Sequence, residues 1–192
     1  YSSTPYDDVF RTLLNDCSEL ILPVLNEAFG EHYTGREQIV FSPNEHFSGH
    51  GSKRITDSSF AVIPGDGAPP KRYHAESQST EDSRMLVRIF EYDTQIALDS
   101  SEAGKDTLTV TFPHSTVLYL RSSRHTPDEM TIRMVVPGGE VSYRVPVIKV
   151  QAYSLEEIFQ KRLLFLVPFY LFNHEKRFRL YEEDEEIGRA HV

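Results

Sequence analysis

A short segment, Arg72-Tyr-His-Ala-Glu-Ser-Gln78, carries polar side chains at a spacing that could support chemistry. In a β-strand alternate side chains point to opposite faces, so His74, Glu76 and Gln78 would share one face. Asp57 lies on the strand that we expect just before this one, where hairpin register could bring its carboxylate beside Glu76. Two adjacent carboxylates repel each other unless a cation lies between them, and hard oxygen donors suit Mg²⁺ or Mn²⁺. A divalent ion would therefore make this arrangement favourable.

Together with three further segments, this strand gives a pattern that extends over most of residues 7–175. The four segments are Asp7-x-x-Phe10-Arg11, Asn44-Glu-His-Phe47, His74-Ala-Glu-Ser-Gln-Ser79 and Arg84-Met-Leu-Val-Arg-Ile-Phe-Glu-Tyr-Asp93. With Asp57 and Glu76-x-Gln78 they resemble the PD-(D/E)XK nuclease superfamily, and more closely the PD-(D/E)XK nuclease family transposases, which are relatives of the Rpn recombination-promoting nucleases. The resemblance implies a restriction-endonuclease-like fold and metal-dependent cleavage of DNA, in proteins tied to mobile elements and recombination. It implies Asp57 and Glu76 as ligands of Mg²⁺ or Mn²⁺.

Gln78 stands where the superfamily name has lysine. A lysine ammonium can stabilise a deprotonated water and the charge that develops on phosphorus, whereas an amide orients water without adding positive charge. A bound ion would still lower the pKa of a water molecule, so glutamine does not exclude hydrolysis. Two functions follow: a DNA endonuclease in which Gln78 orients water, or a catalytically weak or inactive module that keeps the fold and binds nucleic acid or protein.

Glu45 and His74 are further candidates at the same site. Glu45 belongs to the Asn44-Glu-His-Phe47 segment and could supply a third carboxylate to the metal, although a surface turn residue explains it equally well. His74 shares the face of Glu76. It could act behind the metal ligands or contact phosphate, and the alternative is an ordinary hydrogen-bonded histidine of the sheet.

Arg84 and Arg88 are four residues apart on an expected helix that follows the metal strand, so their side chains project to one side. Their guanidinium groups could bind the scissile phosphate and its neighbour. The alternative is that they form salt bridges with nearby acids of the same helix, which are Glu81, Asp82 and Glu91.

The elements that must position these residues follow the order helix, strand, hairpin, helix, strands, hairpin, helix, which predicts one mixed α/β sheet flanked by helices, with an additional β-hairpin. The expected helices are residues 5–29, 81–98 and 154–172, and the expected strands are residues 38–42, 55–63, 72–78, 107–112, 116–121, 130–136 and 141–150. Pro23 should kink or divide the first helix, and Gly30 should end it. Ser79 or Thr80 should cap the second helix, and Ser154-Leu-Glu-Glu157 reads as a capping box for the third.

The composition limits the partners of the chain. Its 192 residues suit one domain, which we assign to residues 1–175. The formal net charge is −9, of which residues 182–186 contribute five acids. This is the wrong sign for a protein that coats nucleic acid through its overall charge, so any contact with DNA must be local.

The cysteine content bears on the compartment of the protein, and the carboxyl end bears on which residues belong to the fold. Cys17 is the single cysteine, and we see no secretory signal, so we expect a cytoplasmic protein without a membrane anchor. The sequence does not decide whether the chain forms a homo-oligomer. Residues 176–186 should be an acidic helical or disordered extension, and Ile187-Gly-Arg-Ala-His-Val192 matches the in-frame translation of a common sequencing adapter, which we expect to be an artefact.

Overall fold

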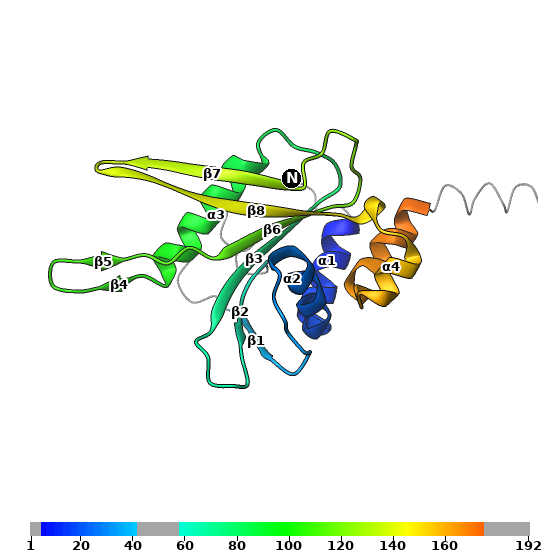
Figure 1. Ribbon diagram of the computed structural model, residues 1–192, viewed down its shortest axis with the longest axis horizontal. Coiled ribbons are helices and arrows are strands. Elements are labelled where there is room, and N and C mark those ends of the chain that lie inside the picture. The colour runs from blue at the N-terminus through cyan, green and yellow to red at the C-terminus, as the bar shows by residue number, and fades with distance from the viewer. Residues whose placement is uncertain (1–4, 42–57, 175–192) are drawn as a thin grey trace, which may run out of the picture.

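The computed structural model describes residues 5–41 and 58–174, and its central feature is a six-stranded mixed sheet (Figure 1). In spatial order the strands are β1 (Gln38–Phe41), β2 (Ser59–Ile63), β3 (Lys71–Gln78), β6 (His114–Tyr119), β8 (Gly139–Lys149) and β7 (Glu129–Val136). β3, β6 and β8 are parallel, and the other neighbours pair antiparallel. The expected mixed α/β sheet is therefore confirmed.

Helices cover both faces of this sheet (Figure 1). They are α1 (Pro5–Asp16), α2 (Ile21–Phe29), α3 (Met85–Asp99) and α4 (Leu155–Gln160), and residues 167–174 are also helical. Two short strands, β4 (Glu102–Ala103) and β5 (Leu108–Thr109), pair with each other outside the main sheet. Figure 1 shows this ribbon and the β7–β8 hairpin projecting in the same direction, away from α4. No helix within residues 5–41 and 58–174 is long and apolar enough to cross a bilayer.

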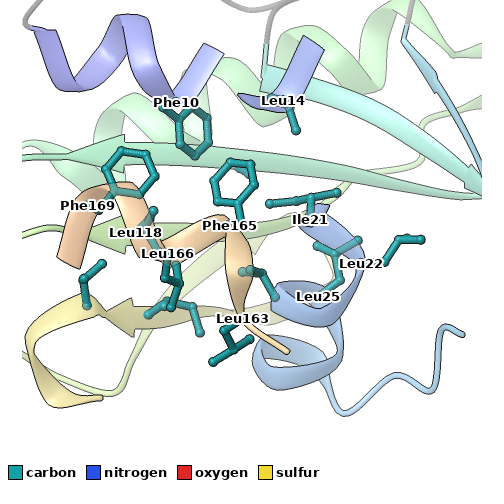
Figure 2. Close-up of a cluster of buried hydrophobic side chains, with 14 of the residues drawn as sticks. Phe10, Leu14, Ile21, Leu22, Leu25, Leu118, Leu163, Phe165, Leu166 and Phe169 are labelled. Carbon is teal, nitrogen blue, oxygen red and sulfur yellow. The ribbon is translucent and has the colours of Figure 1, made fainter. Parts of the chain in front are cut away.

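Two apolar layers, one on each face, hold the sheet between the helices. The larger layer joins α1, α2, α4 and the helical residues 167–174 to the sheet, and Figure 2 shows Phe10, Phe165 and Phe169 packed together within it. The smaller layer joins α3 to β6, β7 and β8. β3 faces both sides, because Tyr73 and Ala75 belong to the larger layer whereas His74 hydrogen bonds to α3. This confirms the expected alternation along β3.

The first helix is divided at a different place from the one expected. α1 ends at Asp16 and a short 3-10 turn, Ser18–Leu20, leads into α2. Pro23 is only the third residue of α2, where backbone N–H groups have no partner within the helix, so a proline costs nothing there. The end at Gly30 is confirmed, since this residue adopts a left-handed conformation with φ of 67°.

The second helix begins at Met85 rather than at residue 81. The Asp82 side chain accepts a hydrogen bond from the backbone N–H of Arg84, at 2.9 Å, and its backbone carbonyl accepts from Met85 at 3.0 Å. Asp82 thus forms a turn that replaces the first expected turn of the helix. The Glu81 carboxylate binds Ser123 at 3.0 Å and also binds Thr126, which anchors this turn to the loop after β6.

The last helix starts as expected and stops early. Both hydrogen bonds of the Ser154–Glu157 capping box are present, but α4 ends at Gln160. Arg162 has a φ of 57°, and the N–H groups of Arg162 and Leu163 donate to the carbonyls of Phe159 and Ile158. This is the hydrogen-bond pattern of a Schellman motif, which terminates a helix.

The expected strand at residues 107–112 is also shorter and differently placed. Only Leu108 and Thr109 form β5, and they pair with β4 instead of entering the main sheet. The position beside β3 is taken by β6, which runs parallel to it from His114 opposite Tyr73 to Tyr119 opposite Gln78. The hairpin of β7 and β8 around Pro137-Gly-Gly139 is confirmed.

Candidate functional site

A small cleft lies where the carboxyl end of β3 meets α1 and α3. Its volume is about 100 Å³. The polar side chains of its wall are Asp7 and Arg11 of α1, Ser58, Glu76, Ser77 and Gln78 around β3, and Arg88 and Tyr92 of α3. Three elements that are distant in sequence therefore contribute charged and amide groups to one concave surface.

His74 lies behind this cleft and is completely buried. Its Nδ1 is 2.9 Å from Oδ1 of Asp93 on α3, and its Nε2 is 2.9 Å from Oε1 of Glu76 on its own strand. An ionised carboxylate can only accept, so both ring nitrogens donate when both acids are charged. His74 is then an imidazolium ion between two carboxylates.

The charge on His74 results from a competition between burial and its partners. Burial alone lowers the pKa of His74, but the hydrogen bonds to Asp93 and Glu76, together with their negative charges, outweigh burial and raise the pKa to about 9. The ring is therefore cationic at neutral pH, and it compensates the buried charge of Asp93.

Asp93 is held by three strands as well as by its own helix. Its Oδ1 accepts from the Ser115 hydroxyl of β6 at 2.5 Å and from His74 of β3, and its Oδ2 accepts from the Tyr143 hydroxyl of β8 at 2.8 Å. Burial, followed by the charge of Asp93, raises the pKa of Tyr143, so this hydroxyl keeps its proton. Asp93 is fully buried, and these donors fix its carboxylate in one orientation.

Glu76 is the point at which this buried network reaches the cleft. Its side chain is 16 % exposed, whereas those of His74 and Asp93 are 0 % exposed. The hydrogen bonds of Glu76 within the described residues involve Oε1, which also lies 3.5 Å from the Ser58 hydroxyl. One imidazolium shared by two carboxylates leaves one negative charge, and the exposed member, Glu76, carries it to the surface.

Gln78 and Arg88 form a second polar unit on the same wall. The amide Oε1 of Gln78 accepts from Arg88 Nη2 at 2.8 Å, and Arg88 Nη1 lies 3.7 Å from Asp82 Oδ2. Because arginine can only donate, the amide oxygen must face Arg88, which turns the NH₂ group of Gln78 elsewhere. The Nε of Arg88 is buried and has no hydrogen-bond partner within the described residues. Gln78 can thus offer its N–H donors to another group, while Arg88 uses one lone pair of its oxygen.

The remaining candidates are brought together only in part. Asp57 and Glu45 lie outside the described residues. The register of β2 and β3 sets Ser59 directly opposite His74, so the two residues share the face of Glu76 as expected. Arg84 is exposed, at the position before α3, and is not part of the cleft wall. The buried ring of His74 lies behind Glu76 with both nitrogens bound to carboxylates, so it is not placed to contact phosphate.

The described residues alone do not form a complete metal site. Within residues 5–41 and 58–174 there is no group of three His, Cys, Asp or Glu side chains that could hold an ion. The carboxylate oxygens of the cleft are nevertheless hard donors of the kind that Mg²⁺ and Mn²⁺ prefer. Glu76 is therefore compatible with such an ion, and a full set needs residues outside the described ranges, where Asp57 and Glu45 lie.

Asp93, Ser115 and Tyr143 were not predicted as site residues. Asp93 could have been found, because Met85, Ile89 and Asp93 are spaced by four and lie on the buried stripe of α3. A charged residue on such a stripe is unfavourable unless it is paired, and so indicates a buried partner. Ser115 and Tyr143 give no comparable signal, since their contacts depend on the sheet order.

Comparisons of this chain with protein-family models, with curated proteins and with solved structures found no match.

Proposed function

We propose that this protein is a metal-dependent DNA endonuclease with a restriction-endonuclease-like fold, which hydrolyses phosphodiester bonds in a process linked to mobile elements or recombination. The observation that carries the proposal is the cleft at the end of β3, where Glu76, Gln78 and Arg88 converge in front of the buried His74–Asp93 pair. An acid with an uncompensated charge beside a donor amide and a guanidinium group suits a site for a cation and a phosphate.

Glu76 and Asp57 would hold Mg²⁺ or Mn²⁺, and Glu45 would be a third ligand. When bound, the ion would supply Lewis-acid chemistry to the phosphodiester and lower the pKa of a water molecule. The imidazolium of His74 holds one oxygen of Glu76, so we assign the other oxygen, Oε2, to the ion. His74 itself is not a ligand in this proposal, because both of its nitrogens are engaged and protonated.

Gln78 and Arg88 would act on the substrate rather than on the ion. The NH₂ group of Gln78 can donate to a phosphate oxygen or to a lone pair of water, but the amide cannot accept a proton. Arg88, bound to Gln78 at 2.8 Å, would supply the positive charge that a lysine provides elsewhere. Arg11 also reaches the cleft and would bind a neighbouring phosphate, with Arg84 further along the DNA. This local set of cations can bind DNA although the chain as a whole carries −9.

The second candidate function is a nuclease-fold module that binds nucleic acid or protein without turnover. The observation that favours it is the Gln78–Arg88 pair itself, because an amide cannot accept a proton from water, and the described cleft wall contains no histidine or lysine that could do so in its place. Binding of DNA that is independent of Mg²⁺ and insensitive to Glu76→Gln would support this module.

The two functions are separated by the nicking of supercoiled plasmid DNA in Mg²⁺, in Mn²⁺ and in EDTA. The wild-type protein should convert supercoiled to open-circular DNA only with a divalent ion, and Glu76→Gln and Asp57→Asn should abolish this conversion. Glu91→Gln is the matched control, since Glu91 is an exposed acid of α3 outside the cleft wall. Equal nicking by the wild type and by the Glu76 and Asp57 variants would assign the activity to a contaminant and refute the endonuclease.

A further inference from the structure

We propose that Asp93 is a positioning residue that acts through His74 to fix the carboxylate of Glu76. This inference rests on the proposed function for its consequence, the binding of a cation. It gives a role to Asp93, to which the resemblance assigns none. Asp93 and His74 are both fully buried, and a buried ion pair is seldom more stabilising than apolar side chains of the same size. A buried pair at this position is better explained by its effect on Glu76, the partly exposed carboxylate to which His74 is bound.

Asp93 is held rigidly by its hydrogen-bond donors. Its two oxygens accept from Ser115, His74 and Tyr143, which lie on three strands of the same sheet, while Asp93 itself is on α3. Movement of the carboxylate would break hydrogen bonds to several elements at once, and Asp93, His74 and Ser115 all lie in the buried interior, where the dielectric is low. The position of Asp93 Oδ1 therefore fixes the direction in which Nδ1 of His74 donates.

The orientation of the His74 ring is transferred to Glu76. With Nδ1 bound to Asp93, the other ring nitrogen of His74, Nε2, faces Glu76 Oε1 at 2.9 Å. A glutamate has three rotatable side-chain bonds, and the hydrogen bond selects the conformation that keeps Oε1 at the ring. The second oxygen is then presented in one orientation rather than in several.

The charge that reaches the cleft is set by the same three side chains. Two acids, Asp93 and Glu76, share one basic ring, His74, through contacts of 2.9 Å each, so the cluster contains one more acid than it has bases. Asp93 is 0 % exposed and surrounded by donors, whereas Glu76 is 16 % exposed and lies on the cleft wall. The network thus fixes where the carboxylate points and leaves it negative, and both conditions favour capture of a divalent ion.

The test uses Mn²⁺ binding, measured by isothermal titration calorimetry, on the full chain and its variants. Asp93→Asn keeps the shape of the side chain and removes its charge, and it should weaken Mn²⁺ binding roughly tenfold or more, the usual effect of losing a hydrogen-bond partner behind a metal ligand. Tyr143→Phe removes a single donor to Asp93 and should weaken binding less, in the same direction. Tyr153→Phe, which removes a comparable half-buried hydroxyl bound to Glu27, is the control and should leave Mn²⁺ affinity unchanged.

His74→Gln separates positioning from simple electrostatics. Removing a positive charge next to Glu76 would tighten cation binding if charge alone mattered, whereas loss of the hydrogen bond that orients Glu76 should weaken it. Tighter Mn²⁺ binding by His74→Gln, or unchanged affinity in both His74→Gln and Asp93→Asn, would overturn the inference. Thermal unfolding followed by circular dichroism identifies a variant that has lost its fold, and in that event Tyr143→Phe decides.

A measurement without metal keeps this inference distinct from the proposed function. In protein labelled with ¹³C at glutamate carboxyl groups, the Glu76 line is assigned by its absence in Glu76→Gln. This line should be sharp in the wild type, and it should shift or broaden in Asp93→Asn when EDTA is present. If the wild type binds no Mn²⁺, the endonuclease proposal fails, and the Glu76 line alone then decides whether Asp93 positions the acid. An unchanged line would overturn the positioning role.

Discussion

The buried charge of His74 predicts that the metal-free protein loses stability as the pH rises above neutrality. In the unfolded chain the pKa of histidine is about 6.5. In the folded protein burial lowers the pKa of His74, but the hydrogen bonds to Asp93 and Glu76 outweigh burial and raise the pKa to about 9. A group whose folded pKa is the higher one binds its proton more tightly in the native state. Its contribution to the free energy of unfolding is therefore complete below pH 6.5 and is lost as the pH rises through 9.

The size of this effect follows from the two pKa values. They differ by about 2.5, and each pKa unit corresponds to about 1.4 kcal/mol, so the full contribution lies between about 3 and 4 kcal/mol, of which about 3 kcal/mol is lost between pH 6.5 and 9.5. No reduction for solvent screening is needed, because His74 is completely buried. His114 does not distort this window, since burial, its largest cause, lowers the pKa of that ring and moves its titration below pH 6.5.

The assay is urea unfolding followed by circular dichroism between pH 6.5 and 9.5 in EDTA. The reference is the double variant His74→Gln/Asp93→Asn, which removes the buried cation and its buried counter-ion together and so avoids leaving either charge unpaired. The free energy of unfolding of the wild type should fall by about 3 kcal/mol relative to the double variant over this range. Parallel curves for the two proteins would show that His74 is not held as an imidazolium, and the charge distribution proposed for the cleft would then be wrong.

Two further predictions concern α3, with the residue before it, and α4. Arg88→Ala should reduce DNA nicking roughly 10²-fold, because it removes a cation bound to Gln78 at the cleft, whereas Arg84→Ala should change nicking far less, since Arg84 is exposed and outside the cleft wall. Steady-state kinetics on a short duplex would check both, and equal effects of the two variants would contradict the assignment of Arg88. Ser154→Ala should lower the free energy of unfolding by about 1 kcal/mol through loss of the N-cap of α4, and an unchanged urea midpoint would contradict it.

Several elements could be predicted because the interactions that fix them are local. The alternation of β3 follows from a side-chain period of two, and the capping box of α4 lies within four residues. The same holds for the left-handed Gly30 at the end of α2. These features needed no knowledge of the rest of the chain.

Other elements depended on contacts that a local pattern does not contain. α3 starts late because Glu81 is bound to Ser123 and Thr126, more than forty residues away, and because Asp82 closes a turn on Met85. α4 ends early at a Schellman motif in which Arg162 occupies the left-handed position that glycine usually takes, so the usual marker of a helix end is missing.

The candidate site was predictable to the extent that it lies on one strand. The common face of His74, Glu76 and Gln78 could be derived from the sequence, and so could the pairing face of Ser59. The charge state of His74 could not be derived from the sequence, because it depends on Asp93, which contacts the ring from α3. Asp57 stays a prediction, since it lies outside the described residues.

β3 also sets a limit on how the chain can change in length. Tyr73 and Ala75 enter an apolar layer and His74, between them, meets the buried Asp93, while the neighbours of β3 run antiparallel on one side and parallel on the other. Deleting or inserting one residue ahead of His74 would turn the side chains of β3 to the opposite faces of the sheet. The cationic ring of His74 would then enter the apolar layer beneath α1, and an insertion would place the phenol of Tyr73 beside Asp93. The loop of the β7–β8 hairpin and the β4–β5 ribbon can absorb such changes, whereas the residue count of this central strand is fixed by electrostatics as firmly as by packing.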